Sequence, residues 1–147
     1  MEIIKLSDFK RKNFSKAVNE LYQLTDFNNS QYPNYMEWFF GKNIPRIIRG
    51  EGDVLFTLDG LSVQGLIVMK NTKEEKKLCT FMVDECYRKQ NIGTNLLEEA
   101  FKYLKTDKPS ITIPENNIEQ FKFFIDYYDW KNTGITDQYN SREIIYN

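Results

Sequence analysis

The stretch 84–94 is the part of the chain best suited to chemistry, because it combines two cations with a glycine just before a predicted helix. Arg88 and Lys89 precede Gly93. A loop that leads into a helix presents unpaired backbone N–H groups, which together with the helix dipole favour an anion such as phosphate. Gly93 lets a ligand approach the backbone, and Asn91 tolerates a left-handed conformation. The stretch therefore predicts a phosphate site, with an ordinary solvated turn as the alternative.

Several other kinds of site are excluded by residues that the chain lacks. No GKS or GKT follows the loop, and it holds one glycine where a dinucleotide-binding fingerprint needs three. The chain has no histidine, which removes Ser-His-Asp and Cys-His pairs and every His-ligated metal site. The two cysteines, Cys79 and Cys86, have no CxxC spacing, so reduced thiols and no metal centre are expected.

Charge and length narrow the class of protein. Lys and Arg number 20 and Asp and Glu 21, a balance that argues against nucleic acid as the partner. Charges interrupt the apolar N-terminus early, and no apolar run approaches the ~20 residues that span a bilayer, so no membrane association and a cytoplasmic location are expected. The 147 residues predict a single domain, 1–147.

The N-terminal third alternates between strand and helix patterns. A short strand is expected at 3–6, and apolar residues at helical spacing predict a helix over 14–22. Asn34 and Glu37 have capping-box spacing, and the helix that they open should stop before Pro45.

The remainder predicts a mixed α/β fold, that is, a mostly antiparallel central sheet flanked by helices. Asp59-Gly60 joins a hairpin, and a third strand completes a meander whose second and third strands, apolar on both faces, should be central and covered. Asn116-Asn117 can cap the last helix, and Gly134 should turn the chain. The expected elements are strands at 54–58, 63–69, 78–83, 110–113 and 144–146, and helices at 92–104 and 118–128.

The loop also carries a resemblance to a known family. Val83, the run Arg88-Lys89-Gln90-Asn91-Ile92-Gly93 and then Leu96-Leu97 are similar to the acyl-CoA signature of the GNAT superfamily of N-acetyltransferases. That signature reads R/Q-x-x-G-x-G/A between a strand and an amphipathic helix, and here Asn91 replaces its first glycine. The resemblance covers about residues 53–146 and implies a GNAT-like fold with the acyl-CoA site at the junction of the fourth strand and third helix.

By this resemblance, acetyl-CoA is the acyl donor and the loop is its binding site. An exposed strand edge can satisfy the amide-rich pantetheine arm, and a helix N-terminus can hold the pyrophosphate. Asn117 would contact the cofactor from the other side, unless it only caps the following helix. The implied cofactor-binding residues are Met82, Val83 and Asp84 for the pantetheine, and Arg88, Lys89, Gln90, Asn91, Ile92, Gly93 and Thr94 for the pyrophosphate.

The resemblance implies direct attack of a neutral amine on the thioester within a ternary complex. The tyrosine with which many relatives protonate the leaving sulfur falls on Phe124 or Ile125, so Tyr127 is the candidate acid, with solvent as the alternative. Without histidine the base is a carboxylate, a shifted Lys or Tyr, or water, and spacing does not select one. The carboxylate candidates are Glu115, Glu37 and Asp84; an acyl-cysteine route through Cys86 is a further alternative.

The acceptor side is assigned to residues 1–52, and residues 53–147 form the acyl-CoA-binding core and closing strands. Tyr35, Glu37 and Trp38 are the candidate acceptor-side residues, although an aromatic stripe at helical spacing also suits a core. The expected activity is N-acetylation of a primary amine on a small molecule, peptide or protein. Rival hypotheses are a non-catalytic acyl-CoA sensor and a protein-interaction module without a cofactor. The high aromatic content leaves a homodimer open.

Overall fold

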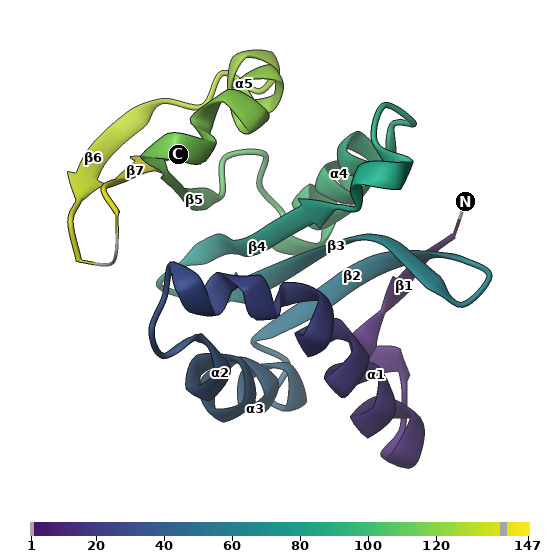
Figure 1. The fold of residues 1–147 in the computed structure, drawn as a ribbon. Helices are drawn as coiled ribbons and strands as arrows, with labels where there is room; N and C mark the ends of the chain where they lie inside the picture. Colours follow the sequence, from purple (N-terminus) through teal and green to yellow (C-terminus); the bar gives the residue numbers. More distant parts are fainter. Residues whose placement is uncertain (1, 139–140) are drawn as a thin grey trace.

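In the computed structural model, which describes residues 2–138 and 141–147, the core is a mixed sheet with strand order β1-β2-β3-β4-β5-β7-β6 (Figure 1). Every neighbouring pair is antiparallel except β4 and β5, which are parallel. The strands are β1 (Ile3–Lys5), β2 (Gly52–Asp59), β3 (Ser62–Asn71), β4 (Lys76–Val83), β5 (Ser110–Pro114), β6 (Asn132–Thr136) and β7 (Glu143–Tyr146). The predicted fold class is confirmed.

Helices cover both faces of this sheet. The first three pack on one face, α4 lies on the other, and α5 covers the part formed by β5–β7 (Figure 1). The helices are α1 (Arg11–Thr25), α2 (Tyr35–Trp38), α3 (Ile44–Ile48), α4 (Ile92–Leu104) and α5 (Ile118–Tyr127), with short turns η1 (Leu6–Asp8), η2 (Asp26–Ser30), η3 (Phe39–Asn43), η4 (Glu85–Tyr87) and η5 (Glu115–Asn117).

Strand alternation separates two hydrophobic cores. On β2, Leu55 faces the α4 side while Val54 faces the α1 side, and on β3 Ile67 and Val68 divide in the same way. Because successive side chains of a strand point to opposite faces, strands that are apolar throughout must be covered on both. The sheet therefore separates two layers of helices, and a ligand can reach its strands only where neighbouring strands move apart.

β4 and β5 are the neighbouring strands that move apart. These strands pair only at Lys77 with Ser110 and at Leu78 with Ile111, and then separate. The register between β3 and β4 shifts at the same level, where Val68 faces Thr80 but Met69 faces Leu78, so Cys79 is an extra residue on β4. Such a β-bulge bends its strand and increases the local twist. The bulge thus bends β4 at the point where it leaves β5.

Two local predictions in the N-terminal third are wrong. Asn34 makes no side-chain capping bond, so the capping box with Glu37 does not form. The helical path also does not stop before Pro45: it continues from α2 through the π-helical turn η3 into α3. Pro45 lies in the first turn of α3, where its missing N–H would have no partner in any case.

Three predictions in the remainder also need correction. Gly134 does not turn the chain but lies inside β6, which pairs with β7. β4 is central, yet only Leu78 of its residues is fully buried, because β5 leaves its side. Asn117 begins α5 without a side-chain capping bond. Within the described residues, the search for a membrane-spanning helix finds none with the required length and apolar character.

Candidate functional site

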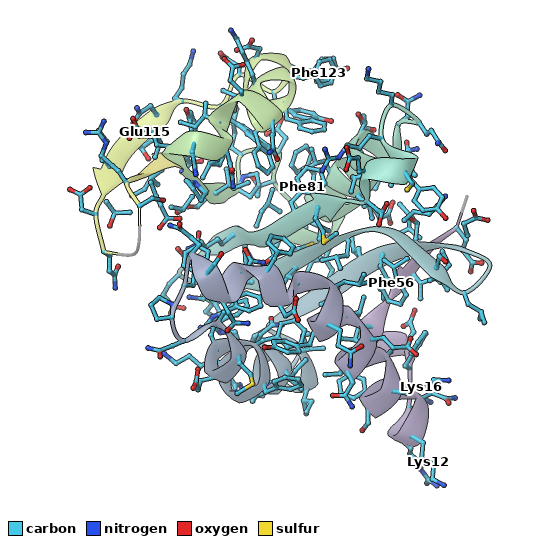
Figure 2. The ribbon with its side chains drawn as sticks, in the orientation of Figure 1. Lys12, Lys16, Phe56, Phe81, Glu115 and Phe123 are labelled. Carbon is cyan, nitrogen blue, oxygen red and sulfur yellow. The ribbon has the colours of Figure 1, made fainter. Side chains whose placement is uncertain are left out.

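A cavity of about 1040 Å³ lies in the split between β4 and β5. Its walls come from the second half of β4, the loop and first turn of α4, β5, and the start of α5. Figure 2 shows Phe81 in this split, between β4 and the part of the molecule that carries α5. The Phe81 ring packs against Phe121 and Phe124, with centroids 5.9 and 5.4 Å away. Apolar rings thus line the middle of the cleft.

One wall of this cleft is a free strand edge. Past Leu78, β4 pairs with β3 alone among the described residues, so its backbone groups on the other side face the cavity. Met82, Val83 and Asp84 all line that cavity. A free edge offers regularly spaced N–H and C=O groups that an extended amide chain can pair with. The structure thus places all three predicted strand residues where such a chain could lie.

The free edge leads into the N-terminus of α4. Asn95 N donates to Asn91 O at 3.0 Å, so the N–H groups of Ile92, Gly93 and Thr94 precede the first helical hydrogen bond of that ladder. Asn91 itself has φ of 63° and is left-handed, as predicted, and Lys89 has φ of 62°. Left-handed residues in such a turn direct successive N–H groups inward and form an anion-binding concavity.

The remaining loop side chains divide into those at the cavity and those away from it. Arg88 and Lys89 line it and are exposed, and Arg88 Nε donates to Val83 O at 3.2 Å, which ties the loop to the end of β4. Gln90 does not line the cavity. The loop therefore brings two cations, but not the Gln90 side chain, to the helix N-terminus.

Gly93 has a role in packing. A Cβ at this position would lie 3.1 Å from Phe124 Cζ and 3.2 Å from Phe81 Cζ, tighter than ordinary contact. The absent side chain therefore lets α4 approach the rings of α5 and β4. This structural reason is additional to the expectation that Gly93 makes room for a phosphate.

The opposite wall carries Asn117 but not Tyr127. Asn117 lines the cavity and its side chain makes no capping bond, so its amide is available to a ligand. Tyr127 is 65% exposed, lies outside the cavity lining, and stacks on Phe123 with centroids 5.7 Å apart. Phe124, one of the two residues at the family's tyrosine position, does line the cavity. The structure therefore does not bring the candidate acid to the cleft.

A second cavity of about 810 Å³ lies beside the first, bordered by α2, α3, β4, β5 and β7. Tyr35 and Trp38 line it, whereas Glu37 is exposed and does not. Burial raises the pKa of Tyr35. Two of the three predicted acceptor-side residues are thus brought to one cavity.

Glu143 is a candidate site residue that the sequence analysis missed, and it lies beside Tyr32, one of the aromatic residues of the expected acceptor side. Both line the second cavity, and the Tyr32 hydroxyl donates to Glu143 Oε2. Glu143 is fully buried, and its Oε1 has no hydrogen-bond partner in the part of the chain that the structure describes. The available signal was strand alternation: Glu143 shares a face with Ile145, opposite the core residues Ile144 and Tyr146.

The predicted carboxylate bases lie in less suitable places. Glu115 forms a two-point ion pair with Arg142, at 2.6 and 3.1 Å, on the outside of the molecule (Figure 2). Asp84 lines the first cavity, but its carboxylate accepts from Cys86 N at 2.9 Å. Cys86 is exposed and lies outside the lining of both cavities.

Cys79, the bulge residue, borders both cavities and is not suited to nucleophilic chemistry. Burial raises the pKa of its thiol to about 11. Because the thiolate is the nucleophilic form, a thiol with this pKa is almost entirely protonated near neutral pH. Cys79 is therefore a structural residue of the strand.

Comparison with known proteins adds the family context. The sequence matches no family model and no curated protein. The structure matches a GNAT-family acetyltransferase of Bacillus cereus with a TM-score of 0.55 and 19% identity, over 69% of this chain and 72% of that one. The chain has the GNAT fold.

Two other solved GNAT-like structures carry a ligand. An acetyltransferase of Bacillus subtilis in complex with CoA matches with a TM-score of 0.61 and 16% identity, over 99% of this chain and 95% of that one. A protein of Bacillus anthracis assigned as a streptothricin acetyltransferase, in complex with acetyl coenzyme A, matches with a TM-score of 0.56 and 18% identity. This match covers 65% of the present chain, which spans 61% of that protein. At these identities the likeness establishes the GNAT fold.

Proposed function

We propose that this GNAT-fold protein is an acetyl-CoA-dependent N-acetyltransferase that acetylates a primary amine by direct transfer. The observation that carries the proposal is the free edge of β4, which runs into the N-terminus of α4 within one cavity of about 1040 Å³. Similar structures hold acetyl coenzyme A or CoA, which supports the same donor here.

The cleft fits the parts of acetyl-CoA in order along its length. The N–H groups at the start of α4, with the charges of Arg88 and Lys89, suit the diphosphate. The β4 edge at Met82–Asp84 suits the amides of the pantetheine arm, with Asn117 on the opposite wall. A donor laid in this direction would have its acyl end near the bulge, where the two cavities share Thr80 and Thr112.

The protein's part in the transfer is mainly positioning. Bound acetyl-CoA supplies a thioester whose acetyl carbon accepts an amine and whose sulfur leaves as thiolate. The two cavities share lining residues at the split, so an acceptor in one would lie next to the acyl end of a donor in the other. Correct alignment of this kind can lower a barrier by about 7–11 kcal/mol. A backbone N–H on the β4 edge could in addition donate to the oxyanion.

The test is release of free CoA thiol from acetyl-CoA in the presence of a panel of primary amines. Turnover that depends on both the protein and an amine is the expected result. Donor binding without release, for every amine offered, would contradict catalysis and leave the alternative of a non-catalytic acyl-CoA sensor. That alternative draws on the position of Tyr127, which is 65% exposed and outside the cleft.

A matched pair of variants tests the donor site itself. Lys89→Gln removes a cation beside the helix N-terminus and should weaken acetyl-CoA binding about 10-fold, as expected for loss of one charge-assisted contact. Lys12→Gln removes an equally exposed lysine at the outer end of α1, away from the cleft (Figure 2), and should leave binding unchanged. Equal affinities in the two variants, measured by calorimetry, would contradict the assignment of the diphosphate to this loop.

A further inference from the structure

The second cavity has a charge pattern that its expected role as an acceptor pocket does not by itself explain. The protein has a net charge of −1, yet the lining of this cavity is rich in cations. Two acidic side chains share it, Glu75 near the basic residues and Glu143 on β7. The basic residues of the lining are Lys42, Arg46, Lys70 and Lys77.

Three of these cations have no ionic partner among the described residues. Lys70 Nζ pairs with Glu75 Oε1 at 2.8 Å, whereas Lys42, Arg46 and Lys77 form no ion pair within the described residues. Arg46 and Lys77 are half-buried and close enough to Glu75 to lower the pKa of its carboxyl, after the larger effect of Lys70. Half-buried cations that face a cavity without a partner attract an anion, because they are less screened than cations in bulk water.

Glu143 supplies a negative charge on another side of this cavity, and it is fully buried. Its Oε2 accepts a hydrogen bond from the Tyr32 hydroxyl, and its buried Oε1 has no hydrogen-bond partner among residues 2–138 and 141–147. A buried polar atom without a hydrogen bond is costly, so such an atom at a cavity suits a ligand that donates to it. Because Tyr32 borders both cavities, Glu143 is also held on the side of the acceptor cavity that is adjacent to the donor cleft.

We infer that the second cavity binds an acceptor that carries both an amine and an anionic group, with its ammonium at Glu143 and its carboxylate or phosphate at Arg46, Lys77 and Lys42. This assignment rests on the proposed acetyltransferase function and narrows its substrate class. It also makes Glu143 the residue that receives the amine, in place of the carboxylates expected from the sequence.

The proton and electron balance of the transfer follows from this arrangement. The ammonium gives one proton to Glu143, and the freed lone pair forms the C–N bond to the acetyl carbon. The C–S bond breaks with its electron pair on sulfur, and a second N–H proton passes through solvent to that sulfur. Glu143 then releases its proton to solvent, so the products are the acetamide, the free thiol and one proton.

Pairs of amines that differ in one anionic group test the inference directly. Suitable pairs are cadaverine with lysine, tyramine with tyrosine, and ethanolamine with phosphoethanolamine. The first two pairs probe a carboxylate and the third a phosphate. In at least one pair, the member that carries the carboxylate or phosphate should exceed the member that lacks it about 10- to 100-fold in kcat/KM. It should also bind more tightly in calorimetry with CoA present, which needs no turnover.

Three variants assign the preference to residues. The double variant Arg46→Gln, Lys77→Gln should bring the ratio within a pair close to one. Glu143→Gln keeps the side-chain shape and should lower kcat/KM about 100-fold or more for every active amine. Tyr32→Phe, which leaves the Glu143 carboxylate in place, should have a smaller effect.

The outcomes separate this inference from the proposed function. Equal kcat/KM for the amines with and without the carboxylate or phosphate would overturn the acceptor class while the acetyltransferase function stands. An unchanged ratio of kcat/KM within a pair in the double variant would do the same. No turnover with any amine, but tighter binding of the anionic members, would overturn the enzyme and leave the cavity assignment supported. Equal binding of both members without turnover would overturn both.

Discussion

Asn91 shows how one backbone conformation shapes the donor site. Its φ of 63° would suit glycine, which stands at this position in the family's signature, and asparagine is among the few other residues that adopt the left-handed region readily. Lys89 is left-handed two residues earlier. The departure from the signature therefore keeps a left-handed residue at this position of the turn.

The left-handed turn before α4 could be anticipated because its pattern is local, whereas the contact between Tyr32 and Glu143 could not. The pattern of the turn is contained in residues 88–94 alone. Tyr32 and Glu143 are 111 positions apart in the sequence, and only the sheet register brings them together. Tyr127 failed to reach the cleft for a related reason. Its separation from Asn117 along the sequence was known. The face of α5 that meets the cleft, however, is set by the packing of Phe124 against Phe81 and Gly93.

Tyr127→Phe tests the reassignment of that residue. Because the side chain is 65% exposed and outside the cavity lining, loss of its hydroxyl should leave kcat within about 2-fold of wild type. The measurement is steady-state release of CoA thiol at saturating acceptor. A fall of 10-fold or more, with acetyl-CoA binding unchanged, would return Tyr127 to the role of acid.

At the scale of elements, strands and helices with a strong apolar periodicity could be predicted from the sequence. Elements with a weak pattern were predicted wrongly where tertiary contacts decide the structure. The polar run Asn132–Thr136, with Gly134 inside it, has no strand pattern of its own; it becomes β6 because β7 offers it an edge. Pro45 follows the π-helical turn η3 and lies in the first turn of α3, the part of a helix that tolerates proline best. The split after Leu78 depends on the bulge at Cys79, which apolarity along β4 does not signal.

Gly93→Ala tests how closely α4 packs on α5. The new methyl group would meet the Phe124 and Phe81 rings at 3.1 and 3.2 Å, and overpacking of this kind costs about 1–3 kcal/mol of unfolding free energy. It should also weaken acetyl-CoA binding, because the rings that must shift line the cleft.

Gly41→Ala is the matched control, since nothing lies within 4 Å of its Cβ position and no unfavourable φ is present. It should be neutral or slightly stabilising. Denaturant unfolding of both variants measures the difference. Equal stabilities of the two variants would contradict the tight packing at Gly93.

Asp53→Asn tests the link between β2 and the turn after β1. Asp53 is buried and accepts from Ser7 N at 3.1 Å and Val54 N at 2.9 Å, and burial raises the pKa of its carboxyl despite these bonds. With a raised pKa, the folded state binds more protons than the unfolded state, so the Asp53 contribution to the unfolding free energy falls as pH rises.

Subtracting the unfolding free energy of Asp53→Asn from that of wild type removes the contribution of the other titrating groups. The unfolding free energy of wild type minus that of Asp53→Asn should decrease from about pH 3 to pH 7, beginning near the ordinary aspartate pKa. Its slope should not exceed about 1.4 kcal/mol per pH unit, the limit for one proton. A difference that rises with pH would contradict the direction of the shift.

At the scale of the whole molecule, one opening in the sheet gives two cavities a common border. Leu78, Cys79 and Thr80 of β4 and Thr112 of β5 line both. Under the proposed function, these adjoining cavities would hold a donor and an acceptor at once, which direct transfer requires. Assembly of the chain into a homodimer stays a prediction, and sedimentation across a range of concentrations measures it.

Thermal unfolding with and without acetyl-CoA tests the central claim most directly. At a concentration ~100 times Kd, binding to the folded state alone should add about 2.7 kcal/mol, a rise in Tm of roughly 5–10 °C for a chain of this size. S-acetylpantetheine, which lacks the diphosphate, should give a much smaller rise, and Lys89→Gln should reduce the shift at a fixed acetyl-CoA concentration. No rise at millimolar acetyl-CoA would contradict the donor cleft, and with it the proposed acetyltransferase function.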